Sequence, residues 1–148
     1  MSFLICPMAR FLSVEASRQT TIRRLGPGDE AVVERLATRA PQTALLADDA
    51  TIFVVAFVDG DPAGLAFGHV LPRRHGDPSI LFVYEVDVDE RFRRRGIATR
   101  LMRELLRLAG TRDAFVLTEP ENDAANALYA SLGGTRVDSV MWDFSTAS

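Results

Sequence analysis

Four arginines stand close together ahead of a predicted helix, in a stretch that also holds small residues. They are Arg91, Arg93, Arg94 and Arg95, and Gly96 and Ala98 follow them. A helix N-terminus carries partial positive charge, so arginines clustered there are unfavourable unless an anion completes the site. The small residues would let a ligand approach the free backbone N–H groups. The pattern therefore predicts a site for phosphate groups.

The alternative interpretation is a solvated basic turn in an arginine-rich protein. The chain contains no lysine, and all 17 of its Lys+Arg residues are arginines. The clustering, the small residues and the position between a strand and a helix favour the phosphate site. The turn matches neither the P-loop motif nor the dinucleotide-binding fingerprint, because their glycine patterns are absent.

The elements on either side of this turn would hold it in place. A mostly apolar strand is expected over Ile80–Val88, with its apolar pattern at Val83, Val86 and Val88. A helix is expected over Gly96–Ala109, because its apolar residues recur at helical spacing. Those residues are Ile97, Leu101, Leu105 and Leu108.

Two acids, Glu85 and Asp87, interrupt the otherwise apolar strand. A carboxylate in a half-buried strand is costly unless it faces a cleft or a partner. The alternative is that both side chains face solvent on one side of the strand and have no chemical role. Partial burial would raise a carboxyl pKa toward the working pH, as a general base requires.

The pattern Arg93-x-x-Gly96-x-Ala98 resembles the acyl-CoA pyrophosphate loop of the GNAT N-acetyltransferase superfamily. A second motif follows it, Asn122-x-x-Ala125-x-x-Leu128-Tyr129-x-x-x-Gly133, and is similar to a later helix of that family. The two motifs stand in the order and at the distance that the family shows. Together they identify the chain as a member of that superfamily.

The resemblance implies acetyl-CoA as co-substrate, with its pantetheine arm in a gap beside the strand Ile80–Val88. Backbone groups of Val86 and Val88 would bind that arm, and the Val88 N–H would stabilise the oxyanion. Asn122 serves either as a helix N-cap or as a contact to the co-substrate, and the two roles are compatible. The other expected co-substrate residues are Arg93, Arg94, Arg95, Gly96, Ile97, Ala98, Thr99 and Ala125.

The resemblance also implies catalytic roles. Glu85 would be the base or the group that orients the amine, with Asp87 as the second candidate. Tyr129 would protonate the departing CoA thiolate, because a phenol of pKa ~10 can protonate the conjugate base of a thiol of pKa ~8.5. A core aromatic with a satisfied hydroxyl is the alternative for Tyr129.

Acidic residues also crowd the loop that precedes the second motif, at Glu119, Glu121 and Asp123. Near an acyl site, carboxylates would attract an amine that carries several positive charges. Asp123 is better explained as a helix N-terminal acid, and for Glu119 both interpretations stand. In the functional interpretation, Glu119 and Asp143 would bind the acceptor and, with Glu85 and Asp87, would form a negative wall on its side. His69 and His75 receive no role.

Several phrases resemble the small aminoglycoside 3-N-acetyltransferases more closely. They are Val70–Arg73, Arg94–Thr99 and Val140–Phe144 with Ser145-Thr146. The resemblance implies that the acetyl group is transferred to a small amine, namely the 3-N position of an aminoglycoside. It also implies direct attack by the amine in a ternary complex, and a role in antibiotic resistance. Glu85 and the loop Thr118–Asn122 depart from those enzymes on the acceptor side. Acetylation of a protein N-terminus or another metabolite, and a non-catalytic acyl-CoA sensor, remain alternatives.

The composition of the chain excludes some classes of binding partner. A net charge of −3 and a pI near 5.4 argue against general nucleic-acid binding. Cys6 is the only cysteine, which excludes an internal disulfide and fits a reducing cytoplasmic compartment. One cysteine and two histidines do not form the spacing pattern of a zinc site. No segment is long enough to span a membrane, and a homodimer is left open. Pro7 and Arg10 interrupt the apolar residues of Met1–Ala16, which argues against a signal peptide.

One domain is expected over residues 20–148, after a weakly ordered extension over 1–19. The predicted strands are Thr21–Leu25, Thr51–Val58, Ala63–Leu71, Ile80–Val88, Ala114–Thr118 and Thr135–Phe144. The predicted helices are Glu30–Arg39, Gly96–Ala109 and Asp123–Leu132, with a short helical turn at Leu45-Leu46. This order predicts an α/β fold of the GNAT type. Its mixed, mostly antiparallel sheet would splay at the acyl-CoA site and carry helices on both faces.

Overall fold

The sheet of this protein contains five strands in their sequence order, β1-β2-β3-β4-β5, in a computed structural model that describes residues 18–146. The strands are β1 (Thr20–Arg24), β2 (Thr51–Val58), β3 (Asp61–Leu71), β4 (Ile80–Val88) and β5 (Asp113–Val116). The helices are α1 (Glu30–Leu36), α2 (Ile97–Ala109) and α3 (Asp123–Ser131), and 3₁₀ turns are η1 (Thr43–Ala47) and η2 (Glu90–Phe92). The mixed α/β fold is the one that the sequence predicts.

Local sequence explains the antiparallel half of the sheet. β2 is almost continuously buried, as its β-branched and aromatic residues predict. Asp59 and Gly60 connect it to β3 with φ angles of 50° and 86°. Positive φ at both central residues is the geometry that a two-residue hairpin requires, and Asp-Gly supplies it.

The one parallel pair in the sheet opens part of the way along β4. Pairing of β4 with β5 runs from Ile80 opposite Asp113 to Val83 opposite Val116. β4 continues to Val88, so its last residues have no partner strand on the β5 side within the described chain. The predicted splay is therefore present, and it exposes an edge of backbone N–H and C=O groups.

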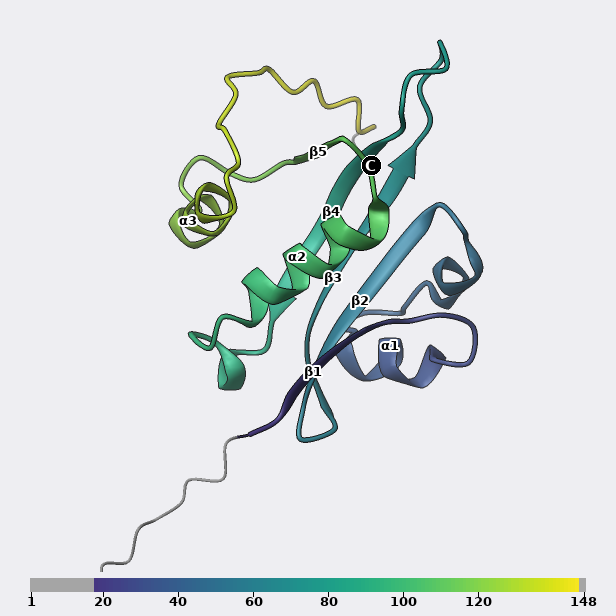
Figure 1. The fold of residues 1–148 in the computed structure, drawn as a ribbon, viewed down its shortest axis with the longest axis vertical. Coiled ribbons are helices and arrows are strands. Elements are labelled where there is room, and N and C mark those ends of the chain that lie inside the picture. The colour runs from purple at the N-terminus through teal and green to yellow at the C-terminus, as the bar shows by residue number, and fades with distance from the viewer. Residues whose placement is uncertain (1–17, 147–148) are drawn as a thin grey trace, which may run out of the picture.

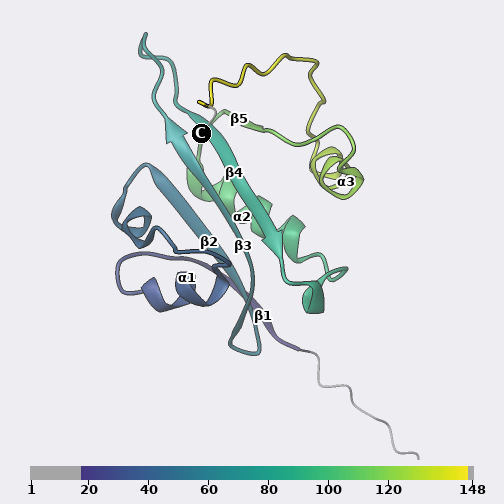
Figure 2. The ribbon, with the colours of Figure 1, turned by 180° about the vertical axis from the view of Figure 1, so that it is seen from behind.

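Helices cover the two faces of the sheet. α2 crosses one face and buries Leu101 and Leu105 completely against a core that includes Leu81 and Val54 (Figure 1). α3 adds half-buried Leu128 and other residues to the same layer. α1 and η1 pack on the opposite face, against a second core with Phe53 and Phe67 (Figure 2).

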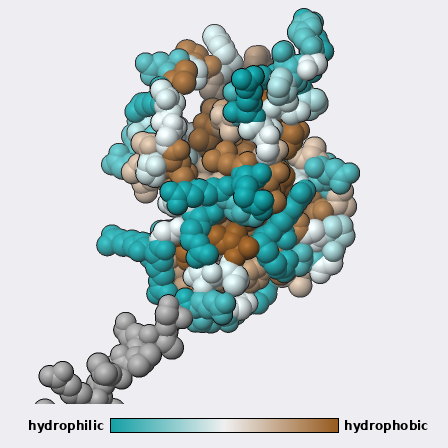
Figure 3. All heavy atoms as spheres, viewed as in Figure 1, coloured by the Kyte–Doolittle hydropathy of each residue, from teal (hydrophilic) through white to brown (hydrophobic). Residues whose placement is uncertain are grey.

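The predicted last strand, Thr135–Phe144, is wrong: this segment forms no strand. Its large apolar side chains are between 74% and 89% exposed, and they are Val137, Val140, Met141, Trp142 and Phe144. β5 is four residues long with three exposed side chains, so its outer edge offers little buried surface to a sixth strand. Hydrophobic residues accordingly reach the surface in the upper half of Figure 3.

The bounds of several other elements differ from the sequence prediction by a few residues. α1 ends at Leu36 instead of Arg39, because Ala37 takes an extended conformation with ψ of 135°. The predicted extension 1–19 lies almost entirely outside the described residues. Within residues 18–146, no helix combines the length and the apolar character that crossing a membrane requires.

Candidate functional site

The arginine-rich turn between β4 and α2 is built on Asp89. Its carboxylate caps η2 by accepting a hydrogen bond from the Arg91 N–H at 2.9 Å, and it also accepts from the Arg91 guanidinium. The side-chain bond from Arg91 and then the backbone bond lower the pKa of Asp89 to about 2. Phe92 is buried below the turn. These contacts fix the turn ahead of α2.

The backbone of this turn takes left-handed conformations at two positions. Gly96 is the N-cap of α2 with φ of 71°, and Arg94 has φ of 62°. Only glycine adopts such a φ without cost, so Gly96 is required by geometry as well as by the need for space. No atom lies within 4 Å of the place that a Cβ at Gly96 would occupy. The helix N-terminus is therefore open to a ligand.

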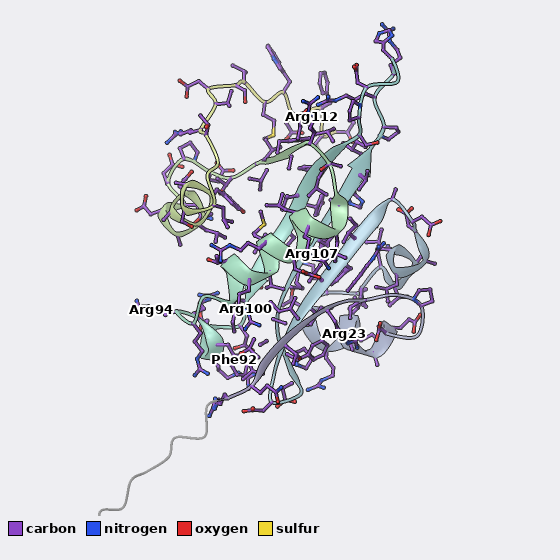
Figure 4. The ribbon with its side chains drawn as sticks, in the orientation of Figure 1. Arg23, Phe92, Arg94, Arg100, Arg107 and Arg112 are labelled. Atoms are coloured by element: carbon purple, nitrogen blue, oxygen red, sulfur yellow. The ribbon has the colours of Figure 1, made fainter. Side chains whose placement is uncertain are left out.

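A cavity of about 320 Å³ lies between this turn and α3. On the turn and α2 it is lined by Val88, Phe92, Arg93, Arg94, Gly96, Ile97, Ala98 and Thr99. Figure 4 shows Arg94 and Phe92 on the turn before α2. The cavity therefore contains most of the residues that the arginine motif predicted.

α3 forms the other wall of the cavity. It contributes Ala124, Ala127, Leu128 and Ser131, which recur at spacings of three and four and so share one helix face. These four residues are absent from the predicted site, although the helical spacing and small side chains of Ala124, Ala127 and Ser131 are a usable signal. The predicted Ala125 and Tyr129 lie outside the cavity lining, on a neighbouring face of α3.

Arg95 and Asn122 also lie outside the cavity lining. The Arg95 guanidinium sits 5.7 Å from the centre of the Phe92 ring, in a cation–π contact. Asn122 is the N-cap of α3, and its side-chain oxygen accepts from the Ala125 N–H at 3.1 Å. The structure thus shows the capping role of Asn122.

Arg93 joins the cavity to the open edge of β4. Its Nε–H donates to the backbone carbonyl oxygen of Val88 at 2.9 Å. The N–H of Asp89 donates to the carbonyl oxygen of Ala63, at the end of β4 that pairs with β3, at 2.9 Å. Because the N–H groups of successive strand residues point to alternate sides, those of Val88 and Val86 point to the opposite, open side. The backbone donors that the family resemblance predicts for an oxyanion and a pantetheine arm therefore face the splay.

A β-bulge brings Glu85 to the other face of β4. Phe67 pairs with Glu85 and Gly68 pairs with Val83, so Tyr84 is an extra residue. Asp87 lies opposite Leu65, two residues further along the same face. Burial among neighbouring atoms, and secondarily the charge of Asp87, raise the pKa of the Glu85 carboxyl. A raised pKa suits a proton acceptor.

A second cavity, of about 330 Å³, opens on the α1 face of the sheet. Asp87 and Asp89 line it from the end of β4, and Arg35 and Leu36 line it from α1. The ion pair between Arg35 and Asp61, at 3.2 Å, lies beside it. This cavity and Glu85 lie on the same side of β4, whereas the first cavity lies on the side of α2 and α3.

The three remaining predicted residues lie in different surroundings. Tyr129 is half-buried against the core below α2, and this burial raises the pKa of its phenol. The backbone oxygen of Glu119 accepts from Asn126 at 3.2 Å, and its side chain is exposed. Asp143 accepts from the N–H and the hydroxyl of Ser145, and these bonds lower the pKa of Asp143. Neither acid lines either cavity.

The arrangement suits a ligand with a phosphate end and a narrow arm. Backbone N–H groups and Arg94 would meet the phosphates, and the open edge of β4 would bind an extended chain. Among residues 18–146, no three His, Cys, Asp or Glu side chains are grouped as a metal site.

Residues 18–133 match the acetyltransferase (GNAT) family. A stretch of 55 residues, 37% of this chain, is 44% identical to N-alpha-acetyltransferase RimI of Mycobacterium tuberculosis and spans only 35% of that relative. An aminoglycoside acetyltransferase from an uncultured soil metagenomic sample superimposes with a TM-score of 0.77 at 26% identity, over 87% of this chain and 99% of that one. The aminoglycoside N-acetyltransferase AAC(6′)-Iy, solved with a bisubstrate analogue of CoA, shares the fold at a TM-score of 0.72 and 21% identity, with 87% and 99% covered. The match over residues 18–133 shows that the chain belongs to the acetyltransferase (GNAT) family.

Proposed function

We propose that this protein is an N-acetyltransferase that transfers an acetyl group from acetyl-CoA to a primary amine of a small molecule. The observation that carries the proposal is that a cavity suited to phosphates adjoins an open strand edge, with a carboxylate on the opposite face of the same strand. The cavity at the N-terminus of α2 adjoins the open backbone edge of β4, and Glu85 stands on the opposite face of that strand. A donor and an acceptor can therefore approach β4 from opposite faces.

The cavity fits the phosphate end of acetyl-CoA. Gly96 leaves free space where a side chain would stand, and Ala98 and Thr99 are small. The N–H groups of the first turn of α2 have no partner within the helix, so an anion stabilises them. Arg94 lines the cavity and would add charge–charge attraction to the pyrophosphate.

The extended arm of the donor would lie along β4 at the splay. The N–H groups of Val86 and Val88 are available on that edge, and the Val88 N–H would stabilise the negative charge that develops on the carbonyl oxygen. Arg93 holds the carbonyl oxygen of Val88, which keeps this end of the strand in place.

The reaction proposed here is direct attack in a ternary complex. The amine nitrogen forms a bond to the thioester carbon, and the bond from that carbon to sulfur breaks. Glu85 accepts the proton that the amine loses, for which its raised pKa is suited. Tyr129 donates a proton to the leaving thiolate, and its burial keeps the phenol protonated until then.

An acceptor with several positive charges is the one that we propose first, namely an aminoglycoside acetylated at its 3-N position. Glu85 and Asp87 share a face of β4, and Asp87 also lines the second cavity. Carboxylates in a recess attract polycations. The similar fold of enzymes whose names specify aminoglycosides supports the class of acceptor. The 3-N position is proposed from the sequence resemblance alone.

A protein N-terminus is the second candidate acceptor. The observation in its favour is the 44% identity over 55 residues to an enzyme named N-alpha-acetyltransferase RimI. A free N-terminus is also a primary amine, and the same donor site and the same base would serve it.

A thiol-release assay with acetyl-CoA and a panel of amines tests the proposal. The panel holds aminoglycosides, linear polyamines, peptides with free N-termini and acidic amino acids. We expect release with aminoglycosides, initial-velocity lines that intersect, as a ternary complex requires, and acetyl at the 3-N position by product NMR. Release with peptides alone would favour the second candidate. Acetyl-CoA binding with no release in any case would point to a non-catalytic sensor.

A further inference from the structure

A row of aromatic rings crosses the α1 face of the sheet from the core to open surface. Phe53 of β2 and Phe67 of β3 stack with ring centres 5.1 Å apart, and Phe67 lies 5.1 Å from Tyr84 of β4. Phe82 and Phe115 continue the row onto β5 at 4.8 Å. α1 and η1 cover the first two rings, which are 6% and 8% exposed, but Tyr84 is 61% exposed.

The β-bulge explains the position of Tyr84. It is the extra residue between the pairs Phe67–Glu85 and Gly68–Val83, so two successive side chains, Tyr84 and Glu85, project on the α1 face. Three rings support Tyr84 from below and beside it, since His69 lies 5.8 Å and Phe82 5.7 Å from its ring centre, in addition to Phe67. The tyrosine ring is therefore exposed and yet held in place.

The charges next to this ring are negative. Glu85 adjoins Tyr84 in sequence, and Asp87 lies two residues beyond on the same face. A large exposed aromatic ring beside carboxylates offers an apolar surface and a negative field together. A saturated ring that carries ammonium groups matches both, because its C–H face packs on the aromatic ring and its cations meet the ring face and the carboxylates.

We infer that Tyr84 is a stacking platform for a saturated ring of the acceptor amine, next to Glu85. The acceptor is then a polyamine carried on saturated rings rather than a flexible linear polyamine or a peptide N-terminus. This inference rests on the proposed function, because it assigns the acceptor side of the same site.

The test compares two amines of similar charge by calorimetry, in the presence of CoA. Sisomicin carries amines on its saturated deoxystreptamine and garosamine rings and on one partly unsaturated ring, whereas spermine is linear. Wild type is compared with Tyr84→Ala and with Tyr84→Phe, which keeps the ring. We expect Tyr84→Ala to weaken sisomicin binding at least tenfold and Tyr84→Phe to bind nearly as wild type. Spermine affinity should change less than twofold between wild type and the variants. If wild type binds no spermine, the variants should bind none either.

Equal losses for both amines, or unchanged sisomicin binding in Tyr84→Ala, would overturn the inference. So would a wild type that elutes as a dimer and a Tyr84→Ala variant that elutes as a monomer, because a second copy would then cover the ring. A thiol-release assay separates the two proposals. If wild type binds sisomicin through Tyr84 but releases no thiol with any amine, the platform stands and the proposed function fails. If wild type binds no sisomicin, the platform is wrong whatever the assay shows.

Discussion

The Nε–H of Arg93 donates to the carbonyl oxygen of Val88 at 2.9 Å, and this bond connects the arginine-rich turn to the last residue of β4. The same guanidinium lies 3.9 Å from Asp87 and 3.8 Å from Glu90. Part of the hydrogen-bonding capacity of Arg93 is therefore used within the protein. Arg94, which also lines the cavity, is the better candidate for a direct phosphate contact.

Replacing Tyr129 with phenylalanine should lower turnover by roughly a hundredfold, the usual range for one acid–base group. The ring and its packing against the core remain, so folding should be unaffected. Steady-state kinetics and calorimetric binding of acetyl-CoA are the measurements. A variant with normal kcat would return Tyr129 to a structural role.

The pH dependence of kcat/KM should report on Glu85. A base works only when deprotonated, so the rate should fall as pH drops through the raised pKa of Glu85. Glu85→Gln should lose roughly a hundredfold or more in rate. Asp87→Asn is the matched comparison: it removes one cause of the raised pKa, so the acidic limb should move to lower pH. If Asp87→Asn loses more activity than Glu85→Gln, Asp87 is the base instead.

Glu85 should also cost stability at neutral pH. Its pKa is raised in the folded protein, so folding favours the protonated carboxyl. The cost is absent below the pKa of the unfolded chain and is complete once pH exceeds the folded pKa. Glu85→Gln should therefore raise Tm at pH 7, and the difference should vanish near pH 3. A variant that melts lower than wild type at pH 7 would contradict this sign.

Gly68 should not tolerate alanine. A Cβ there would lie 2.5 Å from the carbonyl oxygen of Phe82, on the strand that carries the bulge. We expect Gly68→Ala to lower the free energy of unfolding by about 1–3 kcal/mol, as overpacking does. Gly26→Ala is the control, because its Cβ would meet no atom within 4 Å. Equal denaturation midpoints for the two variants would contradict this prediction, because β3 and β4 would then accommodate the added methyl group without cost.

Much of the fold could be predicted because local patterns determine it. β2 and β4 have the predicted bounds, since runs of β-branched and aromatic residues end at a hairpin turn or a polar loop. Thr135–Phe144 shows the limit of this reasoning. A strand needs an edge to pair with, and a sequence pattern does not say whether the neighbouring strand offers one.

The site shows a similar division. The turn from Arg93 to Thr99 could be predicted, because arginines and small residues before a helix have a chemical meaning of their own. The bounds of α3 agree with the predicted helix to within one residue, but the face that meets the cavity depends on how the helix is rotated against α2. Ala124 and Leu128 line the cavity and Ala125 does not, and only the packing determines which.

Calorimetric titration of acetyl-CoA into wild type and Arg94→Gly tests the central claim most directly. Arg94 has φ of 62°, so glycine removes the guanidinium without straining the backbone. Arg74→Gly removes the same charge from the loop between β3 and β4, at the opposite end of β4, and is the control. We predict that Arg94→Gly weakens acetyl-CoA binding at least tenfold, about 1.4 kcal/mol, and that Arg74→Gly binds as wild type. Equal affinity for all three proteins, or no binding by wild type, would contradict the assignment of the cavity to acetyl-CoA.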